Sequence, residues 1–398
     1  METDKTKERI YSIDFLRGVV MMIMLLDHTR DFVHTGGFDP TDLTKTNAAL
    51  FLTRWITHYC APAFVFLSGV SIFLQKQNGK SSGELAWFLL TRGLWLVFLE
   101  FTIVRFSFAF NLDYSFFGVG QVIWAIGMSM VVMSALVLLP LRAVGVIGVA
   151  IILLHNLLDG IRVPDEIMLD SAASLSQALW IILHQPGTVK VFDGASQVFF
   201  LYPLLPWIGV MAAGFAFGTL YSWNAERRRK WLLALAVTAT VLFVVLRLIN
   251  IYGDPAQWAV QDTNAFTILS FLNTTKYGPS LLFILMTLGP SMIVLAVADS
   301  FNGQALWQRI AITFGRVPLF FYLQQFFVAH IMGILLAVLA GKDLSWVFAD
   351  NPTPPPDHGF SLAVTYAAWI VGLIILYPGC AWYSEYKRQH KHWLLSYL

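Results

Sequence analysis

A succession of long apolar segments is the feature that most constrains how this chain can fold. Windows of about 20 residues, the length that crosses a bilayer core as a helix, recur along the whole sequence. We identify about ten such windows: 14–33, 55–75, 88–110, 118–139, 143–159, 198–222, 231–250, 280–299, 316–340 and 360–383. The fifth is short, and the first and ninth carry polar residues near one end. The sequence therefore predicts an all-α, polytopic integral membrane protein.

The composition supports this fold class. Hydrophobic residues make up 57% of the chain and charged residues only 13%, whereas a soluble protein usually carries about a quarter charged residues. The aromatic content of 15% is typical of proteins with residues at membrane interfaces. The basic residues form no stripe suited to tracking phosphates, so we expect no nucleic-acid partner. The two cysteines do not have the spacing of a metal site, and we expect no metal.

The basic residues between the windows predict the orientation of the chain. The clusters ERRRK (226–230) and KRQHKH (387–392) belong on the cytoplasmic side if positive residues are retained inside. With an even number of spans, both termini are then cytoplasmic. No linker separates the chain into parts, so we expect a single domain over residues 1–398. In this topology the longer loops are all external: 34–54, 160–197, 251–279 and 341–359.

The first window ends in a run of polar residues, DHTRDFVH. Four of them fall at i, i+3, i+4 and i+7 and share one face if the helix continues that far: Asp27, Arg30, Asp31 and His34. Ionisable side chains at the end of a span are costly unless they face protein, water or a substrate. We therefore interpret the first two windows as the active-site hairpin of a membrane enzyme.

His28 lies within this run, with Asp27 beside it and Asp31 one helical turn further on. A carboxylate near an imidazole can fix its tautomer and raise its basicity. A general base or an imidazole nucleophile requires this arrangement. The predicted catalytic residues are His28, His34, Asp27 and Asp31.

Other polar residues gather toward the same outer side. We predict that these contact a substrate: Arg30, Glu100, Arg105, Lys276, Tyr322, Gln324 and His330. Glu100 and Arg105 are five residues apart, which is a poor spacing for a pair on one helix. Each can pair across helices instead, and the two can also be a packing pair. The alternative for His34 and Lys276 is that they simply face water.

Several motifs in their order and spacing resemble one family of bacterial membrane proteins. They include RIYSIDFLRGVVMMIMLLDH (9–28), APAFVFLSG (61–69) and YPLLPWIGVMAAGFAFG (202–218). LNTTKYGPSLLFILMTLGP (272–290) and GRVPLFFYLQQFFVAH (315–330) continue the pattern. The family is related to the catalytic domain of heparan-α-glucosaminide N-acetyltransferase. The resemblance extends over essentially the whole chain.

This resemblance implies a transmembrane acyltransferase in a bacterial inner membrane. Acetyl-CoA would be the cosubstrate on the cytoplasmic side, with no permanently bound cofactor. The acceptor would be a sugar amine or hydroxyl of an envelope or extracellular glycan. The resemblance places the catalytic histidine near the outer end of the first span, which ranks His28 first and His34 second. Many relatives carry a histidine where this chain has Gln324 and Gln325, so His330 is the nearest substitute.

Transfer from a thioester needs a base for the acceptor and a donor that stabilises the oxyanion. The candidate donors are Arg30, Arg105, Lys276 and the side-chain amide of Gln324. Cytoplasmic arginines can bind the phosphates of CoA. For this role we predict Arg17, Arg92 and Arg316.

A transporter is the main alternative interpretation. About ten spans, helices interrupted by proline and charges within the membrane also suit a carrier of solutes or lipid-linked glycans. Against this, we find no inverted repeat, and the polar residues favour one leaflet over the midplane. An assembly subunit without catalysis is a weaker alternative, and the sequence is also compatible with a homodimer.

Overall fold

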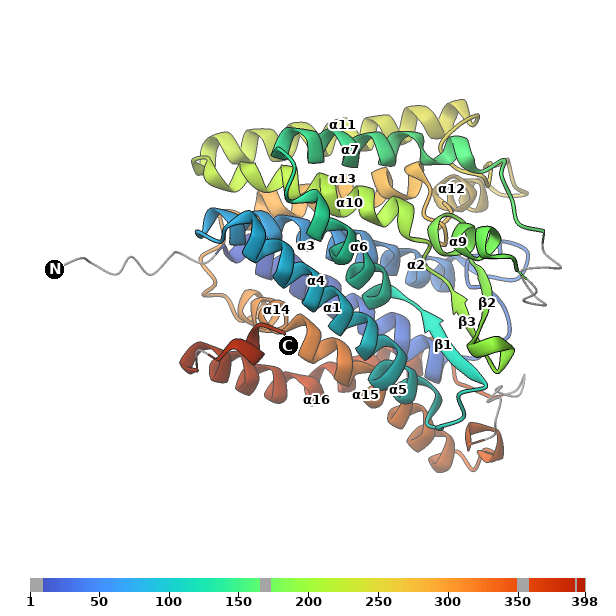
Figure 1. Ribbon diagram of the computed structural model, residues 1–398. Coiled ribbons are helices and arrows are strands. Elements are labelled where there is room, and N and C mark those ends of the chain that lie inside the picture. The colour runs from blue at the N-terminus through green and yellow to red at the C-terminus, as the bar shows by residue number, and fades with distance from the viewer. Residues whose placement is uncertain (1–9, 165–172, 349–357, 391, 398) are drawn as a thin grey trace.

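The computed structural model describes residues 10–164, 173–348, 358–390 and 392–397. Figure 1 shows a bundle of long helices that run between two ends of the molecule. The long helices are α1 (Tyr11–Val33), α3 (Cys60–Gln77), α4 (Ser82–Leu99), α6 (Val122–Leu136), α7 (Leu141–Leu154), α10 (Leu204–Phe217), α11 (Ala225–Ile249), α13 (Leu281–Ala298), α15 (Pro318–Leu339) and α16 (Leu362–Gln389). The shorter ones are α2 (Ala48–Ile56), α5 (Arg105–Ala109), α9 (Leu175–Leu183), α12 (Asn264–Leu272) and α14 (Leu306–Arg316).

Short helical turns extend several of these helices. A π-helical turn at Glu100–Val104 joins α4 to α5. The 3-10 turns are Thr57–Tyr59, His155–Leu158, Phe192–Gly194, Gly218–Ser222, Ser345–Phe348 and Trp393–Ser396. The turn at Thr57–Tyr59 joins α2 to α3, so that Ala48–Gln77 forms one span. A π-helical turn within an α-helix often marks a functional site.

The predicted membrane class is confirmed. Each of the ten predicted windows overlaps one of the long helices, and eight described spans are apolar and long enough to cross a membrane. The two remaining windows correspond to α1 and α6. Helix α1 is long enough but carries several charged residues, and α6 is apolar but only 15 residues long.

Two of the predicted windows begin too early, at residues 118 and 198. Strands β1 (Phe116–Gly120) and β3 (Ser196–Phe200) occupy these starts, and β2 (Gly187–Val191) completes a three-stranded sheet. The strand order is β1-β3-β2, with β1 parallel and β2 antiparallel to β3. The segments FFGVG and SQVFF are as apolar as a span, and a short apolar run does not distinguish a strand from a helix.

The two ends of the bundle differ. The start of α1 and the end of α16 lie at one end, where ERRRK also begins α11 (Figure 1). The sheet, α9 and α12 lie at the opposite end, which we call the outer end. The positive flanks assign the first end to the cytoplasm.

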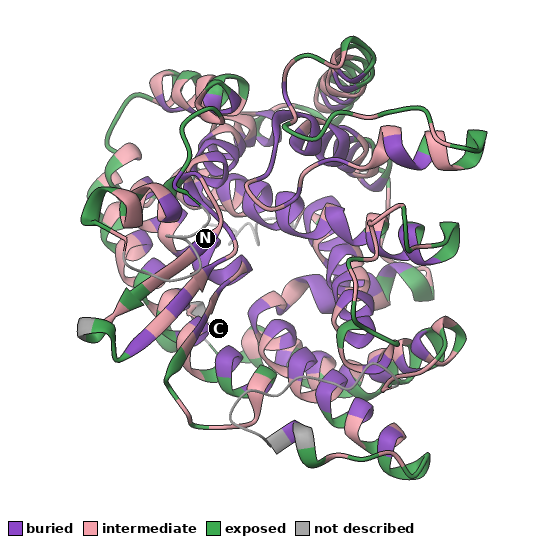
Figure 2. Ribbon diagram, turned by 90° about the vertical axis from the view of Figure 1, so that its right-hand side faces the viewer, coloured by how far each residue is buried: buried purple, intermediate pink, exposed green. Residues whose placement is uncertain are grey.

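Helix α1 lies inside the bundle and contacts α3, α13, α14, α15 and α16. In Figure 2 the buried residues face the interior of the bundle and the exposed ones lie at the periphery. The apolar window of α13 is 78% buried, whereas that of α11 is 22% buried. The apolar side chains of peripheral helices therefore remain available to lipid.

Glycines set how closely α1 approaches α14. A Cβ added at Gly18 would lie 1.7 Å from the carbonyl oxygen of Ala311, and one at Gly315 would lie 1.8 Å from that of Asp14. Neither position can hold a side chain unless the helix backbones separate. The close contact also holds the charged first turns of α1 against the end of α14.

Gly18→Ala is expected to destabilise the protein, because the added methyl group overlaps the α14 backbone. Overpacking of this kind costs about 1–3 kcal/mol. Gly83→Ala in α4 is the matched control, since no atom lies within 4 Å of its added Cβ. Melting temperatures of both variants in detergent would test this, and equal values would refute the close crossing.

Candidate functional site

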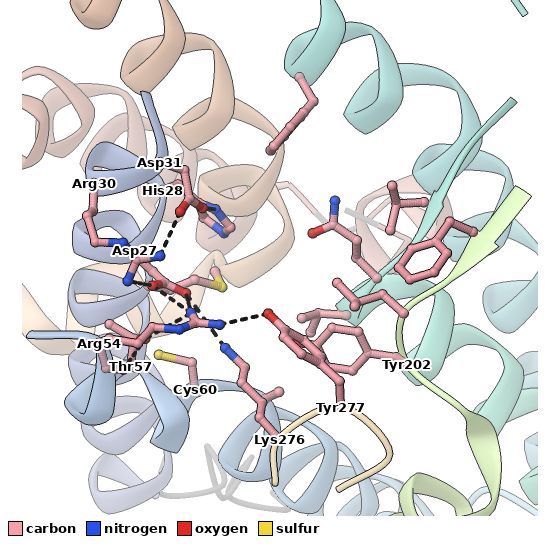
Figure 3. A pocket seen from close by; sticks show the side chains of 18 residues that line it. Asp27, His28, Arg30, Asp31, Arg54, Thr57, Cys60, Tyr202, Lys276 and Tyr277 are labelled. Carbon is pink, nitrogen blue, oxygen red and sulfur yellow. Dashed lines mark hydrogen bonds and ion pairs between the residues drawn. The ribbon is translucent and has the colours of Figure 1, made fainter. Parts of the chain in front are cut away.

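A polar cavity of about 300 Å³ lies near the outer end of the bundle. Helix α1 supplies one wall, the start of the second span another, and the sheet and the loop before α13 enclose the rest. Its lining includes Met24, Asp27, His28, Arg30, Asp31, Arg54, Thr57, Cys60, Gln121, Val122, Phe199, Tyr202, Lys276 and Tyr277. Figure 3 shows the charged side chains of α1 and of the second span meeting Lys276 and Tyr277 across this cavity.

Asp27 is the centre of the charged network. Its Oδ1 lies 2.7 Å from Nη1 of Arg30, and Nη1 of Arg54 donates to both of its oxygens at 2.8 and 2.5 Å. Nζ of Lys276 lies 3.7 Å from Oδ2. All four side chains belong to residues that are only 7–8% exposed. With its oxygens engaged by cations, Asp27 is suited to holding them in place and unsuited to accepting a proton.

Asp31, and not Asp27, is the carboxylate that faces the His28 ring. Nδ1 of His28 lies 3.6 Å from Oδ2 of Asp31, whose other oxygen accepts a 2.6 Å hydrogen bond from Arg30. The imidazole packs against Phe326 at 4.3 Å between ring centres. With Nδ1 directed at a carboxylate, Nε2 is the nitrogen left to meet a substrate in the cavity.

Arg54 connects the centre of the network to the loop before α13. Its Nη2 donates a 2.8 Å hydrogen bond to the hydroxyl oxygen of Tyr277. The Tyr277 ring packs edge-on against Tyr202, with 5.6 Å between centres. Burial raises the pKa of Tyr202 well above its ordinary value, so its hydroxyl stays protonated.

A second, narrower cavity of about 90 Å³ follows the same face of α1 toward the cytoplasmic end. Arg17 and Met21 line this narrower cavity, whereas Met24 and His28 line the outer one. The four positions are three or four residues apart and therefore lie on one face of α1. Its other lining residues are mainly apolar and include Phe64, Leu96, Val122, Ile126, Met130 and Tyr322, with Arg92 beside Arg17. Val122 lines both cavities, so the two adjoin.

Five of the predicted residues line the outer cavity: Asp27, His28, Arg30, Asp31 and Lys276. The His34 ring itself is outside the lining. Its backbone pairs with Phe360, and the residue caps the C-terminus of α1. Burial lowers the pKa of its imidazole. His34 is therefore placed to end the helix and not to meet the same ligand as His28.

Glu100 and Arg105 lie beside the outer cavity and line a small neighbouring one. The Glu100 carboxylate accepts a 2.8 Å hydrogen bond from the backbone NH of Trp124 at the start of α6. Arg105 donates to the carbonyl oxygens of Asn111 and Asp113. The two do not pair with each other. Glu100 accepts from a backbone NH in the first turn of α6, and Arg105 holds the loop that follows α5.

The predicted residues of α15 are dispersed. Tyr322 lines the narrower cavity, and Gln324 lies toward Gly379 of α16. The His330 ring is stacked between Phe32 and Phe110, at 4.5 and 4.1 Å between centres. Its Nδ1 lies 3.1 Å from the carbonyl oxygen of Ser107. These contacts explain the buried His330 without a ligand.

The predicted donor-binding arginines also differ in position. Arg17 and Arg92 line the narrower cavity, but Arg17 already donates to Ser71 Oγ at 3.1 Å and to the Gly315 carbonyl oxygen at 3.2 Å. Arg316 lies 3.9 Å from Asp14 and outside this lining. The guanidinium carbon of Arg92 lies 5.9 Å from the centre of the Phe88 ring.

The sequence analysis missed Arg54, Tyr277 and Tyr202 as site residues. Arg54 was not among the predicted site residues, yet only 8% of it is exposed. The sequence did offer one indication for Tyr277, because it directly follows Lys276, which was a predicted site residue. Within the described ranges, no group of three His, Cys, Asp or Glu residues is arranged to hold a metal ion.

A family model described as heparan-alpha-glucosaminide N-acetyltransferase, catalytic, matches residues 9–247. The matched region covers α1 through most of α11, and so includes His28, Asp31 and Arg54. Lys276 and Tyr277 follow it. No curated protein matches the chain.

Proposed function

Because the chain belongs to the heparan-α-glucosaminide N-acetyltransferase catalytic family, we propose that it transfers an acetyl group from acetyl-CoA to a sugar amine or hydroxyl, with His28 as the general base. The observation that carries this proposal is the placement of His28 in the polar outer cavity, with Nδ1 toward Asp31. This is the arrangement that a base needs, because a carboxylate on one side of the ring orients the other nitrogen toward the reacting group.

The reaction uses one proton and one leaving group. Nε2 of His28 removes a proton from the acceptor amine as its nitrogen attacks the thioester carbonyl carbon. A C–N bond forms and the carbonyl oxygen becomes negatively charged. When the C–S bond breaks, the imidazolium returns its proton to the departing sulfur, which gives the free thiol of CoA. No other reactant is needed for this balance.

The narrower cavity supports an approach of the donor from the cytoplasmic side. Its walls are mainly apolar, and Arg17 and Arg92 line it. An extended pantetheine chain suits an apolar channel of this kind, and the arginines suit the phosphates. Since Arg17, Met21, Met24 and His28 follow one face of α1, a chain entering beside Arg17 would be directed toward His28.

The acceptor would then enter from the outer end. The sheet and the loop before α13 enclose the outer cavity at this end, and they bring Phe199, Tyr202 and Tyr277 to its lining. Aromatic faces of this kind pack well against sugar rings, and nearby polar groups fix their orientation. We therefore propose that the acceptor is an envelope or extracellular glycan and that the protein lies in a bacterial inner membrane.

Asp31→Asn is expected to lower kcat for acetyl transfer about 10- to 100-fold, because it removes the negative charge that lies 3.6 Å from Nδ1 of His28. The KM for acetyl-CoA is expected to stay unchanged, since Asp31 is remote from the narrower cavity. Asp31→Glu should recover part of the activity. The measurement is label transfer from radiolabelled acetyl-CoA to glucosamine by purified protein.

Two outcomes contradict this role. An unchanged kcat in Asp31→Asn would show that the carboxylate does not orient the base. Equal loss in Asp31→Asn and Asp31→Glu, with a lowered melting temperature in both, would indicate a purely structural contact. Absence of thioester loss in the wild type with any acceptor would overturn the proposed function itself.

A further inference from the structure

The outer cavity carries more positive than negative fixed charge. Its charged lining residues are two carboxylates, Asp27 and Asp31, and three cations, Arg30, Arg54 and Lys276. Even when His28 is left out of the count, one positive charge has no partner among the described lining residues. A buried charge is costly unless something opposes it. The cavity is therefore suited to a ligand, or a reaction state, that brings one negative charge.

Lys276 holds the spare hydrogen-bond donors. Its ammonium group has three N–H donors, and its only charged contact within the described chain is the 3.7 Å approach to Asp27, which is too long for a hydrogen bond. Lys276 is only 8% exposed, so bulk water does not easily replace the missing acceptors. By contrast, Arg30 and Arg54 already donate to carboxylates at 2.5–2.8 Å.

Tyr277 is a second donor on the same loop. Its hydroxyl oxygen accepts the 2.8 Å hydrogen bond from Arg54, so its own proton must point elsewhere. Tyr277 lines the cavity, and no described residue accepts that proton. A hydroxyl that accepts from a cation is polarised and donates more strongly. In Figure 3 the Tyr277 oxygen and the Lys276 nitrogen both turn toward the side where Asp27 and Arg54 lie.

The loop that carries both donors is held firmly. The Asp254 carboxylate accepts from the backbone NH and hydroxyl of Thr275 at 2.9 and 2.8 Å, and from the Ser280 hydroxyl at 2.6 Å. Further along, Nε2 of His155 lies 2.9 Å from the Pro279 carbonyl oxygen. The Leu281 NH donates to Asn156 at 2.8 Å. Donors fixed before the reaction stabilise a developing charge without reorganising.

We propose that Lys276 and Tyr277 together form the oxyanion site of the acyl transfer, with Arg54 as the residue that positions the Tyr277 hydroxyl. This rests on the proposed function. The oxygen of the attacked thioester carbonyl becomes negative as the acceptor bonds to carbon, and Lys276 Nζ and Tyr277 Oη donate to it. The charge returns to the carbonyl as the C–S bond breaks. A transient anion matches the one spare positive charge.

Tyr277→Phe and Lys276→Met test this assignment. Each is expected to lower kcat about 10²- to 10³-fold, the usual effect of losing one oxyanion donor. Binding of S-acetonyl-CoA, a donor analogue that keeps a carbonyl but cannot transfer it, should change less than twofold by calorimetry. The matched controls are Tyr252→Phe and Lys45→Met. Tyr252 bonds to Leu153 outside this cavity, and Lys45 is exposed on a loop.

The positioning role of Arg54 has its own test. Arg54→Lys is expected to lower kcat in the presence of Tyr277 but to have little further effect in a Tyr277→Phe background, because both changes remove the same donor. Additive losses would contradict this relation. The test compares the kcat ratio for Arg54→Lys in the wild-type background with the same ratio in the Tyr277→Phe background. An equal loss of folded protein in both backgrounds lowers both ratios by the same factor and therefore does not affect the comparison.

Several outcomes would overturn the oxyanion assignment. Unchanged kcat in Tyr277→Phe would do so, and this variant decides alone if Lys276→Met fails to fold. If Lys276→Met raises KM for an acidic acceptor such as glucosamine 6-phosphate but not for glucosamine, Lys276 binds a permanent anion of the acceptor instead. If Lys276→Met raises KM for acetyl-CoA but not for acetyl-dephospho-CoA, that anion belongs to the donor. Wild-type protein that is inactive with every acceptor would refute the proposed function and leave no oxyanion to stabilise.

Discussion

His28→Ala is expected to reduce acetyl transfer about 10²- to 10⁴-fold, which is the usual contribution of a general base. The substitution removes the only imidazole in the lining of the outer cavity among the described residues. It should leave donor binding largely intact, because the ring lies beyond the narrower cavity lined by Arg17 and Arg92. Label transfer from acetyl-CoA and binding of CoA by calorimetry measure the two quantities separately.

His34→Ala is the matched control for this substitution. The two histidines are six residues apart, but the His34 ring is outside the cavity lining and its backbone pairs with Phe360. Its loss is expected to change kcat by less than about tenfold, since no proton transfer depends on it. The reverse result, in which His34→Ala abolishes transfer and His28→Ala retains it, would move the base to the loop after α1.

Asp27→Asn is expected to lower the free energy of unfolding by about 3–5 kcal/mol, the usual cost of leaving a buried charge without its partner. The change removes the carboxylate that opposes Arg30, Arg54 and Lys276. It leaves three buried cations with Asp31 as the one remaining carboxylate of the lining. Unfolding in mixed detergent micelles, followed by tryptophan fluorescence, measures the difference.

A compensating substitution distinguishes charge imbalance from loss of packing. Arg54→Met in the Asp27→Asn background removes one of the unopposed cations and is expected to recover part of the stability. Asp42→Asn is the surface control, because Asp42 pairs with the exposed Lys45 at 3.6 Å and such pairs contribute little. If the double variant is less stable than Asp27→Asn alone, charge imbalance is not the cause.

The sequence was most informative where charge interrupts apolar segments. Asp27, His28, Arg30 and Asp31 stand out in α1 because few other residues of a span are ionisable, and Lys276 stands out beside a span. All five line one cavity. A membrane span admits such residues only where they have partners, so their presence predicts a polar interior.

The same rule does not tell a site residue from a structural one. Glu100 and His330 also lie in apolar windows, but one binds the start of α6 and the other stacks between two phenylalanines. Each of these partners comes from a distant part of the chain. Sequence spacing predicts neighbours within one helix only, and so it cannot identify contacts between helices.

Two other features were beyond prediction for related reasons. Strands β1 and β3 are apolar and adjoin apolar helices, so hydropathy merges each strand with its helix. Tyr202 and Tyr277 look like ordinary interfacial aromatics by composition. Their importance comes from the fold, which brings Tyr277 to Arg54 across 223 positions of the chain.

Acetyl transfer across a sealed membrane is the most direct test of the central claim. Purified protein would be placed in liposomes with glucosamine trapped inside and radiolabelled acetyl-CoA added outside. The expected result is labelled N-acetylglucosamine inside and an equal amount of free CoA thiol outside, with both lost in His28→Ala. Glucosamine that leaves the liposomes unmodified, without any loss of thioester, would contradict acyl transfer and identify a transporter.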